Sequence, residues 1–466
     1  MSREIAGDDA GVLIEAAGAV DANGDAQDGR VWLRSSSPAS FGDAAAEGAQ
    51  AAGADVVRLP NQVLLPAFAN AHSHAFQRML RGRVEQRSVA HPDDDFWSWR
   101  SLMYDAALQL SPDGFEAIAA WCYLDMVRSG CAVVGEFHYV HHDVDGSPYD
   151  DGTTLSQRLA DAAGHVGLDL VLLNTAYERA GVGRAPDVKQ RRFIFADVDA
   201  FLQHARHVRD AVTGAHIAHG LALHSVRACS STWRQAVADE AKAHQLPLHV
   251  HACEQTAELD EVQAAYGKGP LQVLDDDGAL FASTAVVHAT HIDDDDIALF
   301  ARRQAQVVLC PSTERNLGDG MCPIADLVDA GVRLSVGTDS HARIDLVDEV
   351  RSLEDHERLR LRRRNVLPQP GKSLRHALVH PGSVGGHVAL GRRGHGSWMG
   401  IDLGPTGEAY GPAAAVDAFL VGGSGGDVNH LWVRGRRVVD DKRVVDVDED
   451  AVVQRAVDVM RSLATS

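Results

Sequence analysis

The stretch Leu64-Leu-Pro-Ala-Phe-Ala-Asn-Ala-His72-Ser-His74 joins an apolar run to two histidines that are two residues apart. Side chains at positions i and i+2 of a strand point to the same face, so both imidazoles can reach one metal ion. Such a pair is a weak signal by itself. Its meaning depends on whether other apolar runs of the chain end in the same way.

Three later apolar runs do end in metal-binding residue types. They are Leu248-His249-Val-His251-Ala-Cys-Glu254, Val287-His288-Ala-Thr-His291 and Ser335-Val-Gly-Thr-Asp339-Ser-His341. In a parallel β/α barrel the carboxyl ends of the strands converge on one face. Side chains that are far apart in the chain would therefore meet, and we expect a metal site there.

The order of apolar and helical segments predicts such a barrel. The apolar runs are Val63–Ala69, Cys131–Phe137, Leu168–Asn174, Gly220–Leu223, Leu246–Val250, Ala285–Val287, Gln306–Cys310 and Val332–Val336. Segments with helical spacing lie between them, including Gly114–Val127, Val198–Val212, Thr232–His244 and Asp294–Arg303. This alternation is typical of an α/β protein with a TIM-like (β/α)8 barrel.

The two ends of the chain are expected to form a small β-sandwich domain beside the barrel. Short strand-like runs lie at Val12–Ile14, Arg30–Leu33, Ala418–Val421, Asn429–Val433, Arg436–Val439 and Arg443–Val447, and Asp448–Leu463 has helical spacing. The expected division is residues 1–60 for the N-terminal part of the small domain, 61–395 for the barrel, and 396–466 for the C-terminal part with a terminal helix.

Composition excludes several classes of partner. The 466 residues include 44 Lys plus Arg and 65 Asp plus Glu, a net charge of −21, which argues against binding to nucleic acid or to an anionic membrane. No run reaches the roughly 18 apolar residues that a membrane helix needs. The six cysteines are scattered without a CxxC pair, and the first residues lack the apolar core of a secretory signal. We therefore expect a cytoplasmic protein.

The residues at the strand ends favour zinc or a similar divalent ion, held by three imidazoles and one carboxylate with an open position for water. Such an ion lowers the pKa of its water toward about 7. Glu254 follows His251 closely, so it is placed to move a proton from that water to a leaving group. His288 is expected to polarise the bond under attack or to hold the hydroxide.

The pattern HxH, HxHxxE, HATH and TDSH resembles the amidohydrolase superfamily of metal-dependent hydrolases. Its binuclear members carry a carbamylated lysine on the fourth strand, whereas the fourth run here, Leu221-Ala-Leu-His224-Ser-Val-Arg227, has no lysine. The resemblance therefore implies a site with one metal. Further motifs resemble the formimidoylglutamate deiminases of histidine degradation: His72-Ser-His-Ala-Phe-Gln-Arg78, Phe96-Trp-Ser-Trp-Arg-Ser-Leu-Met-Tyr104, Gly135-Glu-Phe-His-Tyr-Val-His-His-Asp143 and Cys310-Pro-Ser-Thr-Glu-Arg-Asn-Leu-Gly-Asp-Gly320.

This resemblance implies hydrolysis of the formimidoyl C–N bond of N-formimidoyl-L-glutamate, giving N-formyl-L-glutamate and ammonia, by a homodimer with one divalent ion, most simply Zn²⁺, in each subunit. Positions that match the family are implied to take three roles. These are the metal ligands His72, His74, His251 and Asp339, the catalytic residues Glu254, His288 and Asp339, and the substrate contacts Gln77, Arg100, Tyr139, His224 and Arg227.

The chemistry of a substrate with two carboxylates supports the arginines independently, because guanidinium groups hold carboxylates with two hydrogen bonds. Each substrate contact also has a purely structural interpretation. The alternatives are a surface salt bridge for Arg227, an aromatic lid loop around Arg100 built by Trp97 and Trp99, a core phenol for Tyr139 and a hydrogen bond at a helix start for Gln77.

Two other functions stay open on the sequence alone. One is a related deaminase or ring hydrolase that acts on another small, acidic, nitrogenous substrate; Arg100 and Arg227 disfavour an uncharged ring. The other is a binding protein that keeps the barrel without catalysis. Arg315 and Cys253 stand where the family pattern favours small residues, so they are candidates for a change in pocket size or charge.

Overall fold

The larger part of the computed structural model, which describes residues 10–35, 37–85, 95–394 and 396–465, is a barrel of parallel strands. The eight strands lie in the order β13-β12-β11-β10-β9-β8-β7-β6. They are β6 (Phe68–Ser73), β7 (Cys131–His138), β8 (Asp169–Ala176), β9 (Ile217–Ser225), β10 (Leu248–Ala252), β11 (Thr284–His288), β12 (Gln306–Leu309) and β13 (Arg333–Val336). A parallel bridge between Ser73 and Asp339 joins the first strand to the end of the last.

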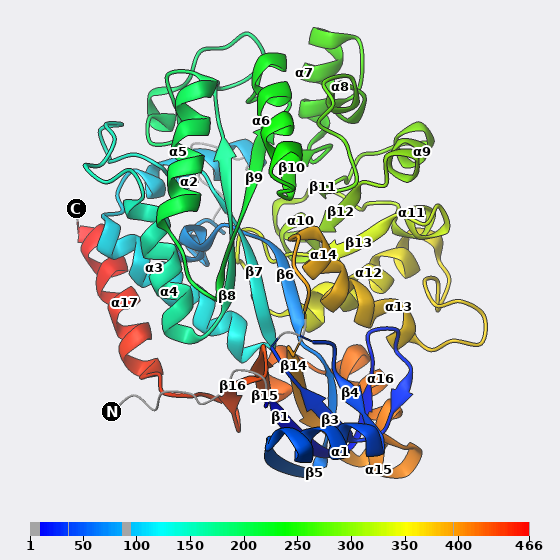
Figure 1. Cartoon of the computed structure of the whole chain (residues 1–466). Coiled ribbons are helices and arrows are strands. Elements are labelled where there is room, and N and C mark those ends of the chain that lie inside the picture. The colour runs from blue at the N-terminus through cyan, green and yellow to red at the C-terminus, as the bar shows by residue number, and fades with distance from the viewer. Residues whose placement is uncertain (1–9, 36, 86–94, 395, 466) are drawn as a thin grey trace.

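Helices follow the strands and surround the barrel (Figure 1). They are α2 (Phe96–Ala107), α3 (Pro112–Arg128), α4 (Thr154–Val166), α5 (Val198–Ala211), α6 (Ser231–Ala243), α7 (Thr256–Tyr266), α8 (Pro270–Asp276), α9 (Asp294–Arg303), α10 (Pro311–Leu317), α11 (Ile324–Asp329) and α12 (Leu346–Leu361). Their starts follow local chemistry. At α9, for example, the Asp293 carboxylate accepts the Asp296 N–H, which satisfies a backbone donor of the first turn.

The two ends of the chain build one mixed sheet of nine strands. The strands are β1 (Val12–Val20), β2 (Ala26–Gln27), β3 (Arg30–Leu33), β4 (Ser40–Phe41), β5 (Asp55–Pro66), β14 (Trp398–Asp402), β15 (Val428–Val433), β16 (Arg436–Asp440) and β17 (Arg443–Val444). Hydrogen bonds therefore join these strands into a single continuous sheet, where the sequence analysis expected a β-sandwich. Its neighbours in the chain are the helices α1 (Gly42–Ala52), α13 (Leu374–His380), α14 (Gly386–Ala389), α15 (Gly404–Tyr410), α16 (Pro412–Gly422) and α17 (Glu449–Thr465).

Two of the apolar runs differ from the prediction. The apolar run Val63–Ala69 is divided between two sheets, because β5 ends at Pro66 in the small sheet and β6 begins the barrel at Phe68. Both pieces are buried, so hydrophobicity could not separate them. The run Ala418–Val421, predicted as a strand, lies inside α16, whose start at Pro412 and following alanines favour a helix.

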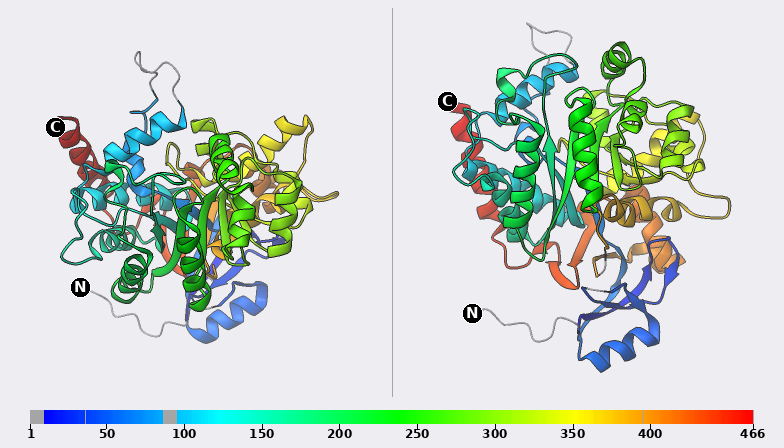
Figure 2. Two further views of the ribbon diagram at one scale, coloured as in Figure 1. Left: turned by 90° about the horizontal axis from the view of Figure 1, so that it is seen from above. Right: turned by 45° about the horizontal axis from the view of Figure 1, so that its top comes forward.

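The small sheet lies against the amino ends of the barrel strands, because β5 passes directly into β6. The carboxyl ends of the barrel strands are therefore free to form a site. Figure 2 shows α17 along the side of the barrel, where it packs against α3, and α1 beyond the small sheet. Among the described residues, no helix combines the length and the apolar character required to cross a membrane.

Candidate active site

Three histidines and one aspartate meet at the carboxyl end of the barrel. His72 and His74 come from β6 and the residue after it, His251 from β10, and Asp339 from the loop after β13. His72 Nε2 lies 3.2 Å from Asp339 Oδ1 and 3.0 Å from His251 Nε2. His74 Nε2 lies 3.4 Å from the same carboxylate oxygen. All four are buried, and their ligand atoms lie within 4.8 Å of one another, close enough to share one metal ion.

The hydrogen bonds of these imidazoles suit a cation. The Nδ1 atom of His74 bonds the Phe137 carbonyl at 3.0 Å, and that of His251 bonds the His224 carbonyl at 2.9 Å. Because a carbonyl oxygen only accepts, each Nδ1 carries the proton and each Nε2 turns a lone pair toward the cluster. Burial lowers the pKa of both histidines and so favours these neutral forms. The residues present therefore fit a divalent metal ion.

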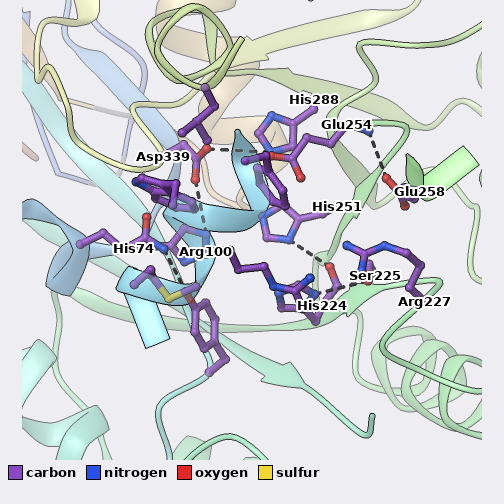
Figure 3. Close-up of a pocket in the computed structure, with 16 residues that line it drawn as sticks. His74, Arg100, His224, Ser225, Arg227, His251, Glu254, Glu258, His288 and Asp339 are labelled. Atoms are coloured by element: carbon purple, nitrogen blue, oxygen red, sulfur yellow. Dashed lines mark hydrogen bonds and ion pairs between the residues drawn. The ribbon is translucent and has the colours of Figure 1, made fainter. Parts of the chain in front are cut away.

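Glu254 and His288 lie beside this cluster, as Figure 3 shows. His288 Nε2 is 3.5 Å from Glu254 Oε1 and 3.9 Å from Asp339 Oδ2. Burial raises the pKa of Glu254 to about 7. For His288, burial favours the neutral form, but the charges of Glu254, Glu314 and Asp339 outweigh it and raise the pKa to about 10. Near neutral pH Glu254 can therefore gain and lose a proton, whereas His288 keeps its proton and can donate a hydrogen bond.

A pocket is formed by these groups, and it brings together every predicted site residue except His72. His72 is fully buried and does not line it. Figure 3 shows the residues of the pocket wall. Its walls include residues from seven segments of the barrel: His74, Gln77, Arg100, Tyr139, His224, Arg227, His251, Glu254, His288 and Asp339. Gln77 Nε2 donates to the Tyr139 hydroxyl at 3.0 Å, which fixes both side chains. Tyr139 is thus a buried phenol that also faces the pocket.

Arg100 enters the pocket from α2, a helix where the sequence suggested a loop. The Asp95 carboxylate accepts the N–H groups of Trp97 and Ser98, so a capped helix forms from this aromatic segment. The buried guanidinium donates to two phenols, Tyr104 at 2.5 Å and Tyr177 at 2.8 Å. No described carboxylate forms an ion pair with it.

Arg227 lies two residues beyond β9 and is also buried. Its Nε atom has no hydrogen-bond partner among the described groups. The guanidinium carbons of Arg227 and Arg100 lie 5.3 and 5.4 Å from the Trp97 ring centre, so one indole faces both cations. Neither arginine has an ion pair within the described part of the chain. Two buried cations without carboxylate partners suit an anionic ligand.

Sequence reasoning missed three acidic residues around the site. Glu258 lines the pocket, and its Oε2 accepts the Glu254 N–H at 3.1 Å. Glu314 Oε1 lies 3.5 Å from His288 Nδ1. Asp319 accepts a hydrogen bond from Gln255, and burial raises its pKa to about 8. Glu314 and Asp319 belong to the motif quoted after the seventh strand, and Glu258 follows Glu254 at helical spacing, so a signal was present for each.

The two residues that departed from the family pattern lie outside the pocket wall. Arg315 points toward α12, where it donates to Asp348 at 2.7 Å and to Ser352 at 3.0 Å. Cys253 is buried behind the strand end. Neither side chain lines the pocket.

Comparison with known proteins agrees with this fold and site. Residues 63–375 match the amidohydrolase family. The chain is 40% identical over 417 residues to formimidoylglutamate deiminase of Pseudomonas aeruginosa, covering 86% of this chain and 88% of that protein. A crystal structure of an amidohydrolase from Brucella melitensis superimposes with a TM-score of 0.87 at 32% identity, covering 97% and 99% of the two chains. The 5-methylthioadenosine/S-adenosylhomocysteine deaminase of Haloarcula marismortui is 26% identical over 412 residues, 87% of each chain. The chain belongs to the amidohydrolase family.

Proposed function

We propose that this protein hydrolyses N-formimidoyl-L-glutamate to N-formyl-L-glutamate and ammonia, a step of histidine degradation. The observation that carries the proposal is the pair of buried guanidiniums, Arg100 and Arg227, that have no carboxylate partner in the described chain. The substrate supplies two carboxylates for them and a cationic amidine for the acidic groups Glu254 and Asp339. The 40% identity to a formimidoylglutamate deiminase supports the same assignment.

We infer that His72, His74, His251 and Asp339 hold one divalent ion, with zinc as the first candidate. Their buried, converging lone pairs support this. When bound, such an ion acts as a Lewis acid that makes a water molecule nucleophilic near neutral pH. The test is direct: wild-type protein should bind one equivalent in competition with a chromogenic chelator, and His74→Ala should bind far more weakly. Equal affinity of the two proteins would contradict the ligand set.

The side chains of the pocket then have separate tasks in the reaction. Glu254 accepts a proton from the water that adds to the amidine carbon and delivers it to the terminal nitrogen. The bond from carbon to this nitrogen breaks and ammonia leaves, while the hydroxyl of the adduct gives its proton to Glu254 and the carbon becomes the formyl carbonyl. His288 holds the attacking oxygen through its hydrogen bond. Arg100 and Arg227 bind the carboxylates, while Gln77, Tyr139 and His224 complete the substrate contacts.

A substrate that lacks one carboxylate tests this assignment. Metal-loaded protein should release ammonia from N-formimidoyl-L-glutamate with a kcat/KM roughly 100-fold higher than from N-formimidoyl-L-glutamine, because a desolvated guanidinium loses its anion. One of the two variants Arg100→Met and Arg227→Met removes the guanidinium that binds the side-chain carboxylate. That variant should largely lose the preference for the glutamate compound. Equal turnover of the two substrates by the wild-type protein would contradict the role of the arginines.

We further propose that the protein acts on this small molecule as a cytoplasmic homodimer, without a nucleic acid or membrane partner. The acidic net charge of −21 supports the absence of a polyanionic partner. Light scattering coupled to size-exclusion chromatography should give twice the chain mass of 50.0 kDa. A single-chain mass at micromolar concentration would contradict the dimer.

A further inference from the structure

Glu258 and Arg227 form a pair of unsatisfied groups on one side of the pocket. Both line it, and Figure 3 shows them on the same side, next to the segment that carries Glu254. Glu258 Oε1 and Arg227 Nε are each buried without a hydrogen-bond partner among the described groups. One is an acceptor and the other a donor. A ligand that satisfies both must offer a donor and an acceptor close together.

The backbone fixes the orientation of the Glu258 carboxylate. Glu258 lies in the first turn of α7, and its Oε2 accepts the N–H of Glu254 at 3.1 Å, so this oxygen is already engaged. The side chain is 2% exposed and cannot rotate into solvent. Oε1 is therefore held at the pocket wall, beside the chain segment that carries the acid/base residue.

Arg227 is near enough to act on Glu258 electrostatically, yet the two do not form an ion pair in the described structure. Burial raises the pKa of Glu258, and the charge of Arg227 opposes this rise. Opposite charges that are desolvated but not in contact are costly. A ligand group placed between them would supply the hydrogen bonds that both lack.

We propose that Glu258 and Arg227 together recognise an N–H group and a carboxylate on the same carbon atom, the pattern of an N-substituted α-amino acid. Glu258 Oε1 accepts the N–H, and the Arg227 guanidinium binds the carboxylate. This inference rests on the proposed function, since N-formimidoyl-L-glutamate carries both groups on its α-carbon. Glu258 is then a specificity-determining substrate contact, and Arg100 is left to bind the distal carboxylate.

The substitution Glu258→Gln tests whether Glu258 recognises the N–H of the substrate or only supports the backbone at Glu254. The glutamine oxygen can still accept the Glu254 N–H, which leaves an NH₂ donor where Oε1 was. The matched control is Glu261→Gln on the same helix, because Glu261 bonds the Val182 N–H and Arg184 away from the pocket. Both variants are compared with N-formimidoyl-L-glutamate and with its Nα-methyl derivative, in which the N–H is absent.

In the wild-type protein, and in Glu261→Gln, the Nα-methyl group should lower kcat/KM roughly 10- to 100-fold, the effect of a lost hydrogen bond to a charged group. In Glu258→Gln the unmethylated substrate should be impaired by a similar factor, and methylation should cost little more. If Nα-methylation lowered kcat/KM by the same factor in the wild type and in Glu258→Gln, the proposal would be overturned. Glu258 would then only support the Glu254 segment.

A binding measurement distinguishes failure of this inference from failure of the proposed function. If metal-loaded protein released no ammonia from N-formimidoyl-L-glutamate, the proposed function would fall. Calorimetry with N-acetyl-L-glutamate and with glutarate would still test Glu258. Tighter binding of the N-acyl compound that Glu258→Gln abolishes supports the recognition of N–H, and equal binding of both compounds by the wild type overturns it.

Discussion

At the scale of single residues, the pocket contains two kinds of group. Glu254 and His288 can hold protons, whereas Arg100 and Arg227 are cations that have no ion-pair partner among the described residues. Burial raises the pKa of Glu254 to about 7, and the surrounding carboxylates raise that of His288 to about 10 in spite of burial. Arg100 is held by phenols, and Arg227 faces an indole on the side of the pocket that also carries Glu258. The pocket thus offers carboxylates beside the place where an amidine would react and guanidinium groups where carboxylates would bind.

Removing the carboxylate of Glu254 tests its role in proton transfer. Glu254→Gln should lower kcat roughly 10²- to 10⁴-fold, because the amide cannot accept the proton of the attacking water. Ammonia release measures the rate, and metal content measured on the same sample should stay at the wild-type level. A variant that keeps most of its kcat would exclude Glu254 as the acid/base residue.

The phenols around Arg100 give a second prediction at this scale. Tyr177 accepts from Arg100 at 2.8 Å and also contacts Tyr104 and Gln190. Tyr177→Phe should raise KM roughly 5- to 10-fold with a smaller change in kcat, since about 1 kcal/mol of hydrogen bonding that orients the guanidinium is lost. The control is Tyr149→Phe, which removes a phenol from Arg192 instead and should leave KM unchanged. A large fall in kcat alone would contradict a binding role.

At the scale of elements, the sequence predicted the parts of the site that sit on strand ends. His72, His251, His288 and Asp339 follow buried apolar runs, and parallel strands bring such ends together by geometry alone. The rest depends on segments whose pattern is weaker. The aromatic composition of Phe96–Tyr104 suggested a loop, whereas its Asp95 cap makes it a helix. Packing also decides that one carboxylate oxygen of Glu258 is hydrogen-bonded and the other is not, and no sequence pattern reports this difference.

A buried group of histidines behind β7 makes unfolding sensitive to pH. His138 follows Phe137 at the end of β7, and His204 lies on α5; both rings pack against His141. Burial, with the like charges of His204 and Arg192, lowers the pKa of His138 to about 3. Burial, with the like charges of His142 and His207, lowers that of His204 to about 4. The ordinary value in the unfolded chain is about 6.5.

The sign follows from proton binding. Between pH 6.5 and about 4 the unfolded chain binds protons that these folded histidines do not, so stability is full above pH 6.5 and falls on acidification. The free energy of unfolding should drop by about 2 kcal/mol for each histidine by pH 4.5. Urea titrations across this pH range measure the free energy of unfolding. Its decrease on acidification should be smaller in His204→Gln than in wild type, and as large as in wild type in His165→Gln, an exposed control on α4. Identical slopes would contradict this origin.

At the scale of the whole molecule, the small sheet closes the amino end of the barrel and leaves the carboxyl end for chemistry. Asp169, the first residue of β8, joins the barrel to the small sheet through Arg434 at 3.1 Å and also pairs with Arg392 at 2.6 Å. The Asp169 carboxylate is 6% exposed, so these ion pairs lie in a poorly solvated seam between the barrel and the small sheet. The site is distant from this seam, and the two can be tested separately.

Breaking this ion-paired seam should affect stability and not catalysis. Asp169→Asn leaves two guanidiniums without their anion, which should lower the free energy of unfolding by about 3 kcal/mol. The kcat/KM for the substrate should stay within about twofold of wild type at 25 °C. Asp161→Asn, on the exposed face of α4, is the control for the substitution itself. An unchanged unfolding midpoint for Asp169→Asn would show that the seam is held by packing alone.

The central claim is that the paired arginines and the buried acid/base group make this chain a deiminase for a dicarboxylate amidine. The measurement that tests it most directly is the quantity of ammonia and of N-formyl-L-glutamate formed by zinc-loaded protein from N-formimidoyl-L-glutamate, beside a parallel reaction with 5-methylthioadenosine. The account predicts both products in equal amounts from the first compound and no ammonia from the second. Ammonia from 5-methylthioadenosine, with none from N-formimidoyl-L-glutamate, would contradict it.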